Sequence, residues 1–214
     1  TNIRFDYAPG CNALAVAEYS LSAMSVLCEN WMHKKVSVIG CGNVGSKLIE
    51  ALTRFGVSCN YFDPFVERED VPKIRVFNHI AQSDILCFHT PLTETGEFPT
   101  KHLVGKELLE SLKPNTIIIN AGRGAVISNK ALLEFLKARN SIKVALDVWE
   151  NEPNIDLELL DLVDIGTPHI AGNTIEGKLR GTKMLHKAFK AWCGFDEHIP
   201  CLLYTSDAAD EERG

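Results

Sequence analysis

Short apolar segments alternate with amphipathic segments along most of the chain, and this alternation restricts the fold more than any other feature. The short apolar segments that contain β-branched residues predict strands at residues 35–39, 57–62, 84–88, 116–119, 142–148 and 163–166. Apolar residues at helical spacing predict helices at residues 12–29, 43–55, 106–112, 129–138 and 174–192. Asn12 stands where its side chain could cap the first helix. Short apolar strands separated by helices predict an α/β fold, a doubly wound parallel sheet covered on both faces.

Composition and charge exclude several classes of protein. Of the 214 residues, 45% are hydrophobic and 23% are charged, and the formal net charge is −6. This globular composition without a basic excess argues against a nucleic-acid or anionic-membrane partner. No apolar stretch reaches the length that a membrane-spanning helix needs. The seven cysteines are scattered through apolar stretches, which predicts reduced thiols, a cytoplasmic location and no metal site.

The segment Gly40-Cys-Gly42-Asn-Val-Gly45 joins the first predicted strand to the helix that follows it. In this position we expect Gly40 to allow a tight turn, Gly42 to admit a pyrophosphate close to the backbone, and Gly45 to let the helix pack on the strand. The helix start at Asn43 and Val44 would then present free N–H groups to the phosphates. The alternative is a glycine-rich turn that binds nothing.

Asp63 follows the next predicted strand. A carboxylate there can accept hydrogen bonds from the adenosine ribose hydroxyls, and it repels the 2′-phosphate of NADP. No arginine directly follows Asp63, so the segment predicts NAD as the cofactor. The alternative is an ordinary surface aspartate.

Further polar residues stand where the predicted strands end, which is the edge at which such sheets bind ligands. Thr90 could donate a hydrogen bond to the cofactor, and the loop glycine Gly122 permits a close backbone approach. Arg123 lies between two glycines and suits forked binding of a carboxylate, with a surface salt bridge as the alternative. Taken alone, His89 is better interpreted as a packed or capping histidine than as a catalyst.

Taken together, these motifs resemble those of the D-2-hydroxyacid dehydrogenase family. The resemblance runs from about Ala8 to Gly194 and implies a Rossmann-type NAD-binding domain that serves the oxidation of a 2-hydroxy acid. Three stretches favour a member that acts on a small phosphorylated 2-hydroxy acid. The family motifs are Pro9–Asn12, Val16–Glu18, Gly40–Gly45, His89–Thr93, Asn120–Gly124, Leu146–Pro153 and Thr167–Gly172, and the three stretches are Ala8–Ala13, Asp164–Gly172 and Glu176–Thr182.

The resemblance implies a catalytic role for three residues. His169 matches the acid/base that exchanges a proton with the substrate hydroxyl, and Glu152 matches its partner carboxylate. Arg123 matches the arginine that orients the substrate carboxylate and polarises the reacting oxygen. Taken singly, Glu152 could be a loop acid and His169 a structural turn residue.

The resemblance also implies contacts to the cofactor and to the substrate. Asp147 corresponds to a contact on the nicotinamide side, and Ala121 and Gly172 correspond to backbone contacts to the cofactor. The substrate would meet Arg123, His169 and Asn173, although the best-known members have a tyrosine at the last position. Lys178 and Arg180 are either phosphate ligands or solvated charges on a helix face.

The resemblance predicts four regions and an incomplete substrate pocket. We expect residues 1–12 to be a remnant of a substrate domain and its hinge, and residues 13–174 to form the NAD-binding domain. Residues 175–194 would be a helix that returns towards the substrate domain. Residues 195–214 would be non-native sequence or an acidic disordered tail. The full-length form would be a homodimer, and this chain by itself could be inactive.

Three functions remain open from the sequence. The chain could belong to the favoured member of the family, which oxidises a small phosphorylated 2-hydroxy acid. It could also belong to another member, such as a 3-phosphoglycerate dehydrogenase. It could instead be an NAD-sensing binding protein on the same fold. The presence of Arg123, Glu152 and His169 together favours an enzyme, because sensing does not require all three.

Overall fold

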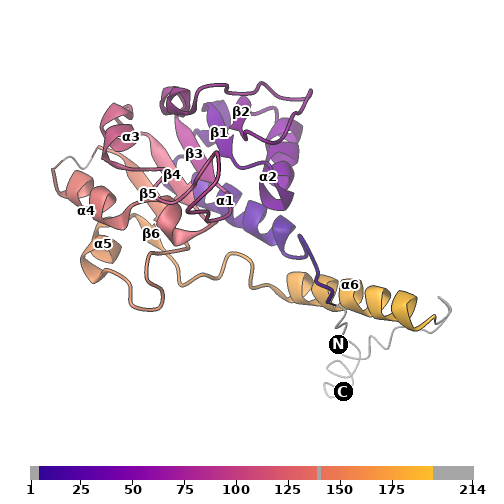
Figure 1. Ribbon diagram of the computed structural model, residues 1–214. Coiled ribbons are helices and arrows are strands. Elements are labelled where there is room, and N and C mark those ends of the chain that lie inside the picture. The colour runs from indigo at the N-terminus through magenta and orange to yellow at the C-terminus, as the bar shows by residue number, and fades with distance from the viewer. Residues whose placement is uncertain (1–4, 139–140, 195–214) are drawn as a thin grey trace, which may run out of the picture.

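The computed structural model describes residues 5–138 and 141–194, and Figure 1 shows a central sheet with helices on both sides of it. Its six strands run in the order β2-β1-β3-β4-β5-β6, and all neighbouring strands are parallel. The strands are β1 (Val36–Ile39), β2 (Cys59–Phe62), β3 (Ile85–Phe88), β4 (Ile117–Asn120), β5 (Lys143–Leu146) and β6 (Ile165–Gly166). The predicted doubly wound α/β fold is confirmed.

The helices agree with the prediction except for one addition. The α-helices are α1 (Ala13–Leu27), α2 (Asn43–Arg54), α3 (Lys106–Ser111), α4 (Asn129–Ala138), α5 (Leu157–Leu162) and α6 (Ile175–Cys193). Three short 3-10 helices are η1 (Trp31–His33), η2 (Phe77–Gln82) and η3 (Gly124–Val126). The prediction omits α5, whose start is capped by Asp156: Oδ1 accepts hydrogen bonds from the backbone N–H groups of Glu158 and Leu159.

The sheet has a separate hydrophobic core on each face. Ile85 and Cys87 of β3 pack with residues of α1 and α2, whereas Leu86 and Phe88 pack with residues of α3, α4 and α5. This division follows from the alternation of side chains along a strand. All residues of β1, β3 and β4 are buried, which explains why these strands read as continuous apolar runs rather than as alternating ones.

The strand order reverses between β1 and β3. The chain leaves β1 towards β2 and later returns on the other side of β1 to form β3. In a parallel sheet such a reversal leaves a crevice outside the carboxyl ends of the two strands, where ligands bind. The loops that follow β1 and β3 therefore place Gly40 and His89 at the centre of the expected site.

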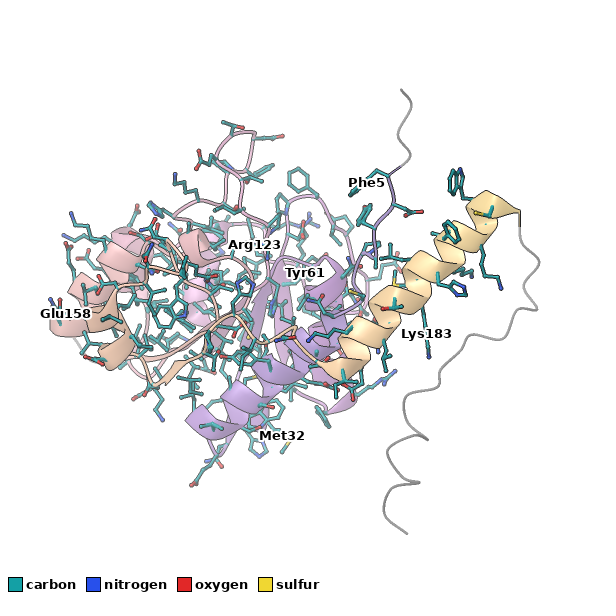
Figure 2. The ribbon with its side chains drawn as sticks, turned by 90° about the horizontal axis from the view of Figure 1, so that it is seen from below. Phe5, Met32, Tyr61, Arg123, Glu158 and Lys183 are labelled. Atoms are coloured by element: carbon teal, nitrogen blue, oxygen red, sulfur yellow. The ribbon has the colours of Figure 1, made fainter. Side chains whose placement is uncertain are left out.

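Helix α6 projects from the body of the protein in both views (Figures 1 and 2), and in Figure 2 its Lys183 lies on the opposite side of the molecule from Glu158. Thr174 caps its start, because Oγ1 accepts a hydrogen bond from Gly177 N. The helix leaves the apolar side chains of Ile175, Phe189 and Trp192 exposed. Among the described helices, α6 included, none is long and apolar enough to cross a membrane.

The predicted division into domains stays a prediction. The predicted tail, residues 195–214, lies outside the described residues, as do residues 1–4 of the predicted hinge region. The expected cap of α1 is wrong in one respect. Asn12 does occupy the N-cap position, but its side chain makes no capping hydrogen bond.

Candidate active site

The glycine motif after β1 forms an open cradle at the start of α2. Gly40 has a φ of +91°, which a glycine adopts without strain, and a Cβ there would lie 2.9 Å from the backbone of His89 and Thr90. A Cβ on Gly45 would lie 1.9 Å from the carbonyl oxygen of Gly40, so only glycine lets α2 approach β1 this closely. A Cβ on Gly42 would meet nothing within 4 Å. The space beside Gly42 can therefore hold a phosphate against the helix N-terminus.

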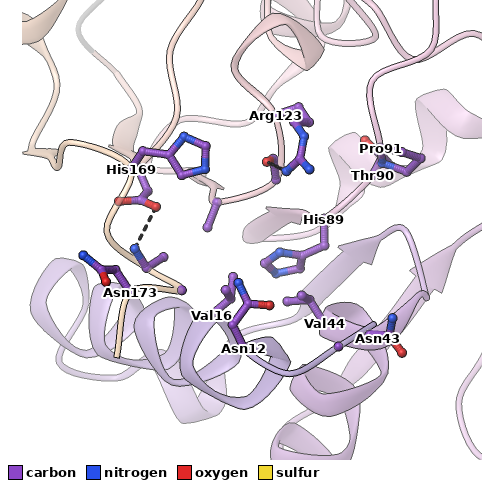
Figure 3. A pocket seen from close by; sticks show the side chains of 16 residues that line it. Asn12, Val16, Asn43, Val44, His89, Thr90, Pro91, Arg123, His169 and Asn173 are labelled. Carbon is purple, nitrogen blue, oxygen red and sulfur yellow. Dashed lines mark hydrogen bonds between the residues drawn. The ribbon is translucent and has the colours of Figure 1, made fainter. Parts of the chain in front are cut away.

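A cavity of about 510 Å³ lies beside this cradle. It brings together the helix start, the loops after β3, β4 and β5, and the segment that precedes α6 (Figure 3). Its lining contains most of the predicted cofactor and substrate residues, namely Asn43, Val44, Thr90, Ala121, Gly122, Arg123, Asp147, His169, Gly172 and Asn173. Residues from segments far apart in the sequence thus meet at a single site.

A second cavity of about 460 Å³ lies on the other side of the cradle and shares His89, Thr90 and Pro91 with the first. Gly40, Gly42 and Asp63 line it together with aromatic side chains that include Phe62 and Phe77. The Oδ2 atom of Asp63 lies 2.8 Å from Cys41 N, so the carboxylate faces the glycine motif. A largely apolar cavity with a carboxylate in its lining fits an adenosine, and the cradle between the cavities fits a pyrophosphate. The residues present therefore fit NAD.

His169 and Glu152 form a hydrogen-bonded pair beside the first cavity. Nδ1 of His169 lies 2.8 Å from Oε2 of Glu152. The second oxygen of Glu152, Oε1, accepts a hydrogen bond of 2.5 Å from Trp149 N. This arrangement fixes the proton of the neutral ring on Nδ1 and leaves Nε2 as a proton acceptor. The pair can therefore act as a general base and acid at the cavity.

Asp147 shapes the segment that carries His169. Its carboxylate accepts hydrogen bonds from Thr167 Oγ1 at 2.7 Å, Ile170 N at 2.8 Å and Ala171 N at 2.9 Å. Its carbonyl oxygen accepts one from His169 N at 2.8 Å. Asp147 is buried and lines the cavity, yet both of its carboxylate oxygens already accept hydrogen bonds. Its predicted contact to the nicotinamide stays a prediction.

Tyr19 extends this network, and the sequence analysis did not single it out. Its hydroxyl oxygen lies 2.8 Å from Thr167 Oγ1. Because Thr167 donates to Asp147, Tyr19 must donate to Thr167. Burial raises the pKa of Tyr19, so the phenol keeps the proton that this bond needs. A tyrosine inside an apolar helix gives no sequence signal of such a role.

Arg123 lies at the rim of the same cavity as His169 (Figure 3). Its side chain is exposed, and Nη1 donates a hydrogen bond of 2.8 Å to the carbonyl oxygen of Gly122. The guanidinium carries five N–H donors in a plane. It can therefore bind a carboxylate in the cavity with two parallel hydrogen bonds.

His89 and Thr90 form the wall between the two cavities. Nδ1 of His89 and Oγ1 of Thr90 are inaccessible to solvent, and neither has a hydrogen-bond partner among the described residues. Burial lowers the pKa of His89 to about 4, so the ring is neutral near pH 7. This environment agrees with a packed histidine. Thr90 can donate to a cofactor only after its side chain rotates.

Of the remaining residues predicted to contact the substrate, one lines the first cavity and two do not. Asn173 lines the first cavity, whereas Lys178 and Arg180 line neither of the two cavities. Nη1 of Arg180 instead donates a hydrogen bond of 3.1 Å to the carbonyl oxygen of Cys11. Sequence reasoning also missed Asn12, which points into the first cavity in Figure 3. A Cβ on Gly172 would lie 2.2 Å from Asn12 Nδ2, so this contact depends on a glycine.

No group of three or more His, Cys, Asp or Glu side chains among residues 5–138 and 141–194 is placed to hold a metal ion. The six described cysteines are free thiols. Burial raises the pKa of Cys41 to about 12, and burial also raises that of Cys87. Both thiols therefore stay protonated and unreactive near pH 7.

Comparisons with known proteins agree with this geometry. The family model of the D-isomer specific 2-hydroxyacid dehydrogenase, NAD binding domain, matches residues 16–171. An erythronate-4-phosphate dehydrogenase of Saccharophagus degradans is 45% identical over 87% of this chain and 51% of its own length. That of Escherichia coli O81 is 46% identical over 92% of this chain and 54% of its own length. The chain thus spans about half the length of the curated relatives it matches.

Solved structures share the fold at lower identity. A 2-hydroxyacid dehydrogenase of Ketogulonicigenium vulgare superposes with a TM-score of 0.75 at 23% identity, covering 92% of this chain and 70% of that chain. A D-lactate dehydrogenase of Aquifex aeolicus, solved with NAD and lactic acid, gives a TM-score of 0.71 at 23% identity over 84% of this chain and 66% of that chain.

Proposed function

Because the chain belongs to the D-isomer-specific 2-hydroxyacid dehydrogenase family and carries its NAD-binding domain, we propose that it serves the NAD-dependent oxidation of 4-phospho-D-erythronate to 2-oxo-3-hydroxy-4-phosphobutanoate. This reaction is a step in one route to pyridoxal phosphate. The choice of substrate follows the relatives named erythronate-4-phosphate dehydrogenase, which are 45–49% identical to this chain. The role of an NAD-dependent dehydrogenase rests on the site itself.

The observation that carries the proposal is the hydrogen bond between His169 Nδ1 and Glu152 Oε2, 2.8 Å long, at a cavity that Arg123 also lines. Oxidation of a secondary alcohol needs a base for the hydroxyl proton and a cation for the neighbouring carboxylate. These are the two functions that His169 and Arg123 can supply. A protein that only senses NAD needs neither of them.

The residues divide the reaction between them. Bound NAD would supply the acceptor for the hydride that leaves C2 of the hydroxy acid. His169 takes the hydroxyl proton on Nε2, so that the alcohol becomes a ketone, and it returns the proton in the reverse direction. Glu152 holds the ring in the required tautomer and stabilises the imidazolium that forms. Arg123 binds the substrate carboxylate and polarises the oxygen on C2.

The cradle and the two cavities would hold the cofactor between them. Gly42, Asn43 and Val44 would hold the pyrophosphate, and Asp63 would bind the ribose hydroxyls. Ala121, Gly122, Asp147 and Gly172 would surround the nicotinamide side of the first cavity, next to His169. Asn173 would meet the substrate, because it lines the same cavity. We also propose that the active form is a homodimer, which sedimentation equilibrium would test.

The experiment joins this chain to the flanking segments of the Escherichia coli O81 relative and follows NADH formation. We expect kcat/KM for 4-phosphoerythronate to exceed that for 3-phosphoglycerate by at least about 100-fold, since a pocket built around polar groups discriminates strongly. The unmodified relative is the positive control, against which kcat/KM of the joined protein is compared. Because the flanking segments bring the relative's own share of the substrate pocket, the preference is compared with that of the unmodified relative, and a shift towards 3-phosphoglycerate would assign the chain to another member of the family. Tight NAD binding without turnover of either substrate would favour an NAD-sensing protein.

A further inference from the structure

The carboxylate of Glu150, two residues before Glu152, ties together three segments of the chain. Its Oε1 atom lies 2.5 Å from Nε2 of His102, and its Oε2 atom accepts a hydrogen bond of 2.7 Å from Asn129 N at the start of α4. The Glu150 side chain is only 18% exposed, whereas that of His102 is 45% exposed. Both carboxylate oxygens are thus engaged in a partly buried setting, where such contacts hold geometry better than those of a fully exposed ion pair.

The same place is where the two catalytic loops touch. Gly124 directly follows Arg123, and a Cβ on Gly124 would lie 2.0 Å from the carbonyl oxygen of Trp149 and 2.7 Å from Glu150 N. The loop that carries Arg123 therefore packs directly against the backbone of the turn that carries Glu152. The backbone N–H of His102 donates a hydrogen bond of 2.7 Å to Ala125 O, which fixes His102 to the Arg123 loop.

Residues with a positive φ gather around this contact. Among the described residues, four other than glycine have a positive φ, and three of them are His102 at +53°, Asn151 at +59° and His169 at +55°. Asparagine and histidine adopt a positive φ more readily than most residues, so these values mark tight turns. The Glu150 carboxylate belongs to the turn from residue 149 to 152 and ties it to His102 and to Asn129 N.

We propose that Glu150 is a positioning residue, which holds the Glu152 turn against the Arg123 loop so that Glu152 faces His169. His102 completes this clamp by donating to Glu150. The inference rests on the proposed role of the Glu152–His169 pair. It adds that the geometry of this pair depends on a carboxylate that lines neither the first nor the second cavity.

The test uses the chain itself with NAD bound and histidine rings labelled with ¹⁵N, so that NMR reports the ring nitrogens of His169. A His169→Gln variant assigns the signals, and Glu152→Gln gives the signature of a broken pair. We expect Glu150→Ala and His102→Leu to move the His169 signals at least half of the way towards that signature. His102→Gln retains a side-chain N–H donor and should keep signals close to those of the wild type.

Two further variants keep the result interpretable. Glu158→Ala removes an exposed carboxylate that pairs with Lys137, and it should leave the His169 signals unchanged. Glu150→Met keeps a side chain of similar volume but removes both acceptor oxygens, so it serves if Glu150→Ala does not fold, as judged from the backbone amide spectrum. A folded Glu150 variant with wild-type His169 signals would overturn the proposal. The measurement uses no substrate, so failure to oxidise 4-phosphoerythronate would contradict the proposed function alone.

Discussion

Glu152 binds His169 with one carboxylate oxygen and the backbone of its own turn with the other. Oε2 lies 2.8 Å from Nδ1 of His169, and Oε1 accepts the N–H of Trp149. A carboxylate held at both oxygens cannot rotate away from the ring, so Nε2 keeps a single direction. The geometry of the proposed catalytic pair is therefore set by a short turn rather than by a long helix or strand.

This relationship predicts the effect of Glu152→Gln. The amide keeps the shape of the side chain but loses the charge that stabilises the imidazolium. We expect kcat to fall by about 10- to 100-fold, as for other outer partners of a reactive group, and Kd for NAD to stay within a factor of two. Steady-state kinetics of the joined protein, with Glu158→Gln as the exposed control, measures this. An unchanged kcat would show that the carboxylate is not needed.

Alanine substitutions at Gly42 and Gly45 of the cradle should have different effects, the first on NAD binding and the second on stability. Gly42→Ala places a methyl group in open space, so we expect the melting temperature to be kept and NAD binding to be lost. Gly45→Ala forces a Cβ to within 1.9 Å of the carbonyl oxygen of Gly40. We therefore expect the free energy of unfolding to fall by about 2 kcal/mol or more. Thermal unfolding and calorimetric NAD titration distinguish them. Full NAD affinity in Gly42→Ala would contradict the phosphate position.

Asp63 should control the choice between NAD and NADP. Its carboxylate faces the glycine motif through Cys41 N, and it would meet the ribose hydroxyls. We expect Asp63→Ala to weaken NAD binding by about 10-fold or more, the value of a hydrogen bond to a charged group, and to bring the two affinities closer together. Asp63→Asn separates charge from shape. An unchanged ratio of the two dissociation constants would remove Asp63 from the ribose site.

Burial of His89 should make stability depend on pH. The pKa of this ring falls from 6.5 to about 4 in the folded protein, so the unfolded chain binds an extra proton between these values. The free energy of unfolding therefore falls as the pH is lowered through this window. We expect a contribution of roughly 2 kcal/mol between pH 7 and pH 4.5. Denaturant titrations should show a shallower pH dependence for His89→Gln, and equal slopes would contradict the account.

The fold was largely predictable because its signals are local. Strands β1, β3 and β4 are buried on both faces, so they read as largely apolar runs, and all six strands lie within two residues of their predicted bounds. The cradle was predictable for a similar reason, since Gly40 and Gly45 stand where backbone geometry excludes side chains. Helix α5 was missed because six residues after an aspartate give too short a periodic pattern.

The site was only partly predictable, because its contacts join distant segments. Asn12 has the residue type of a helix cap, and sequence alone could not show that its side chain turns to the cavity instead. The carboxylate of Asp147 accepts hydrogen bonds from residues about twenty positions away. The bond between Glu150 and His102 spans 48 positions. Such pairings depend on the folded arrangement and leave no periodic trace.

The central claim is that the Glu152–His169 pair performs acid/base chemistry on a substrate beside bound NAD. Its most direct test measures NADH formation from 4-phosphoerythronate by the joined protein carrying His169→Ala, together with the dissociation constant for NAD. We expect turnover to fall at least about 1,000-fold, within the range that acid/base catalysis contributes, and NAD affinity to stay within a factor of two. Turnover close to that of the wild type would contradict the claim.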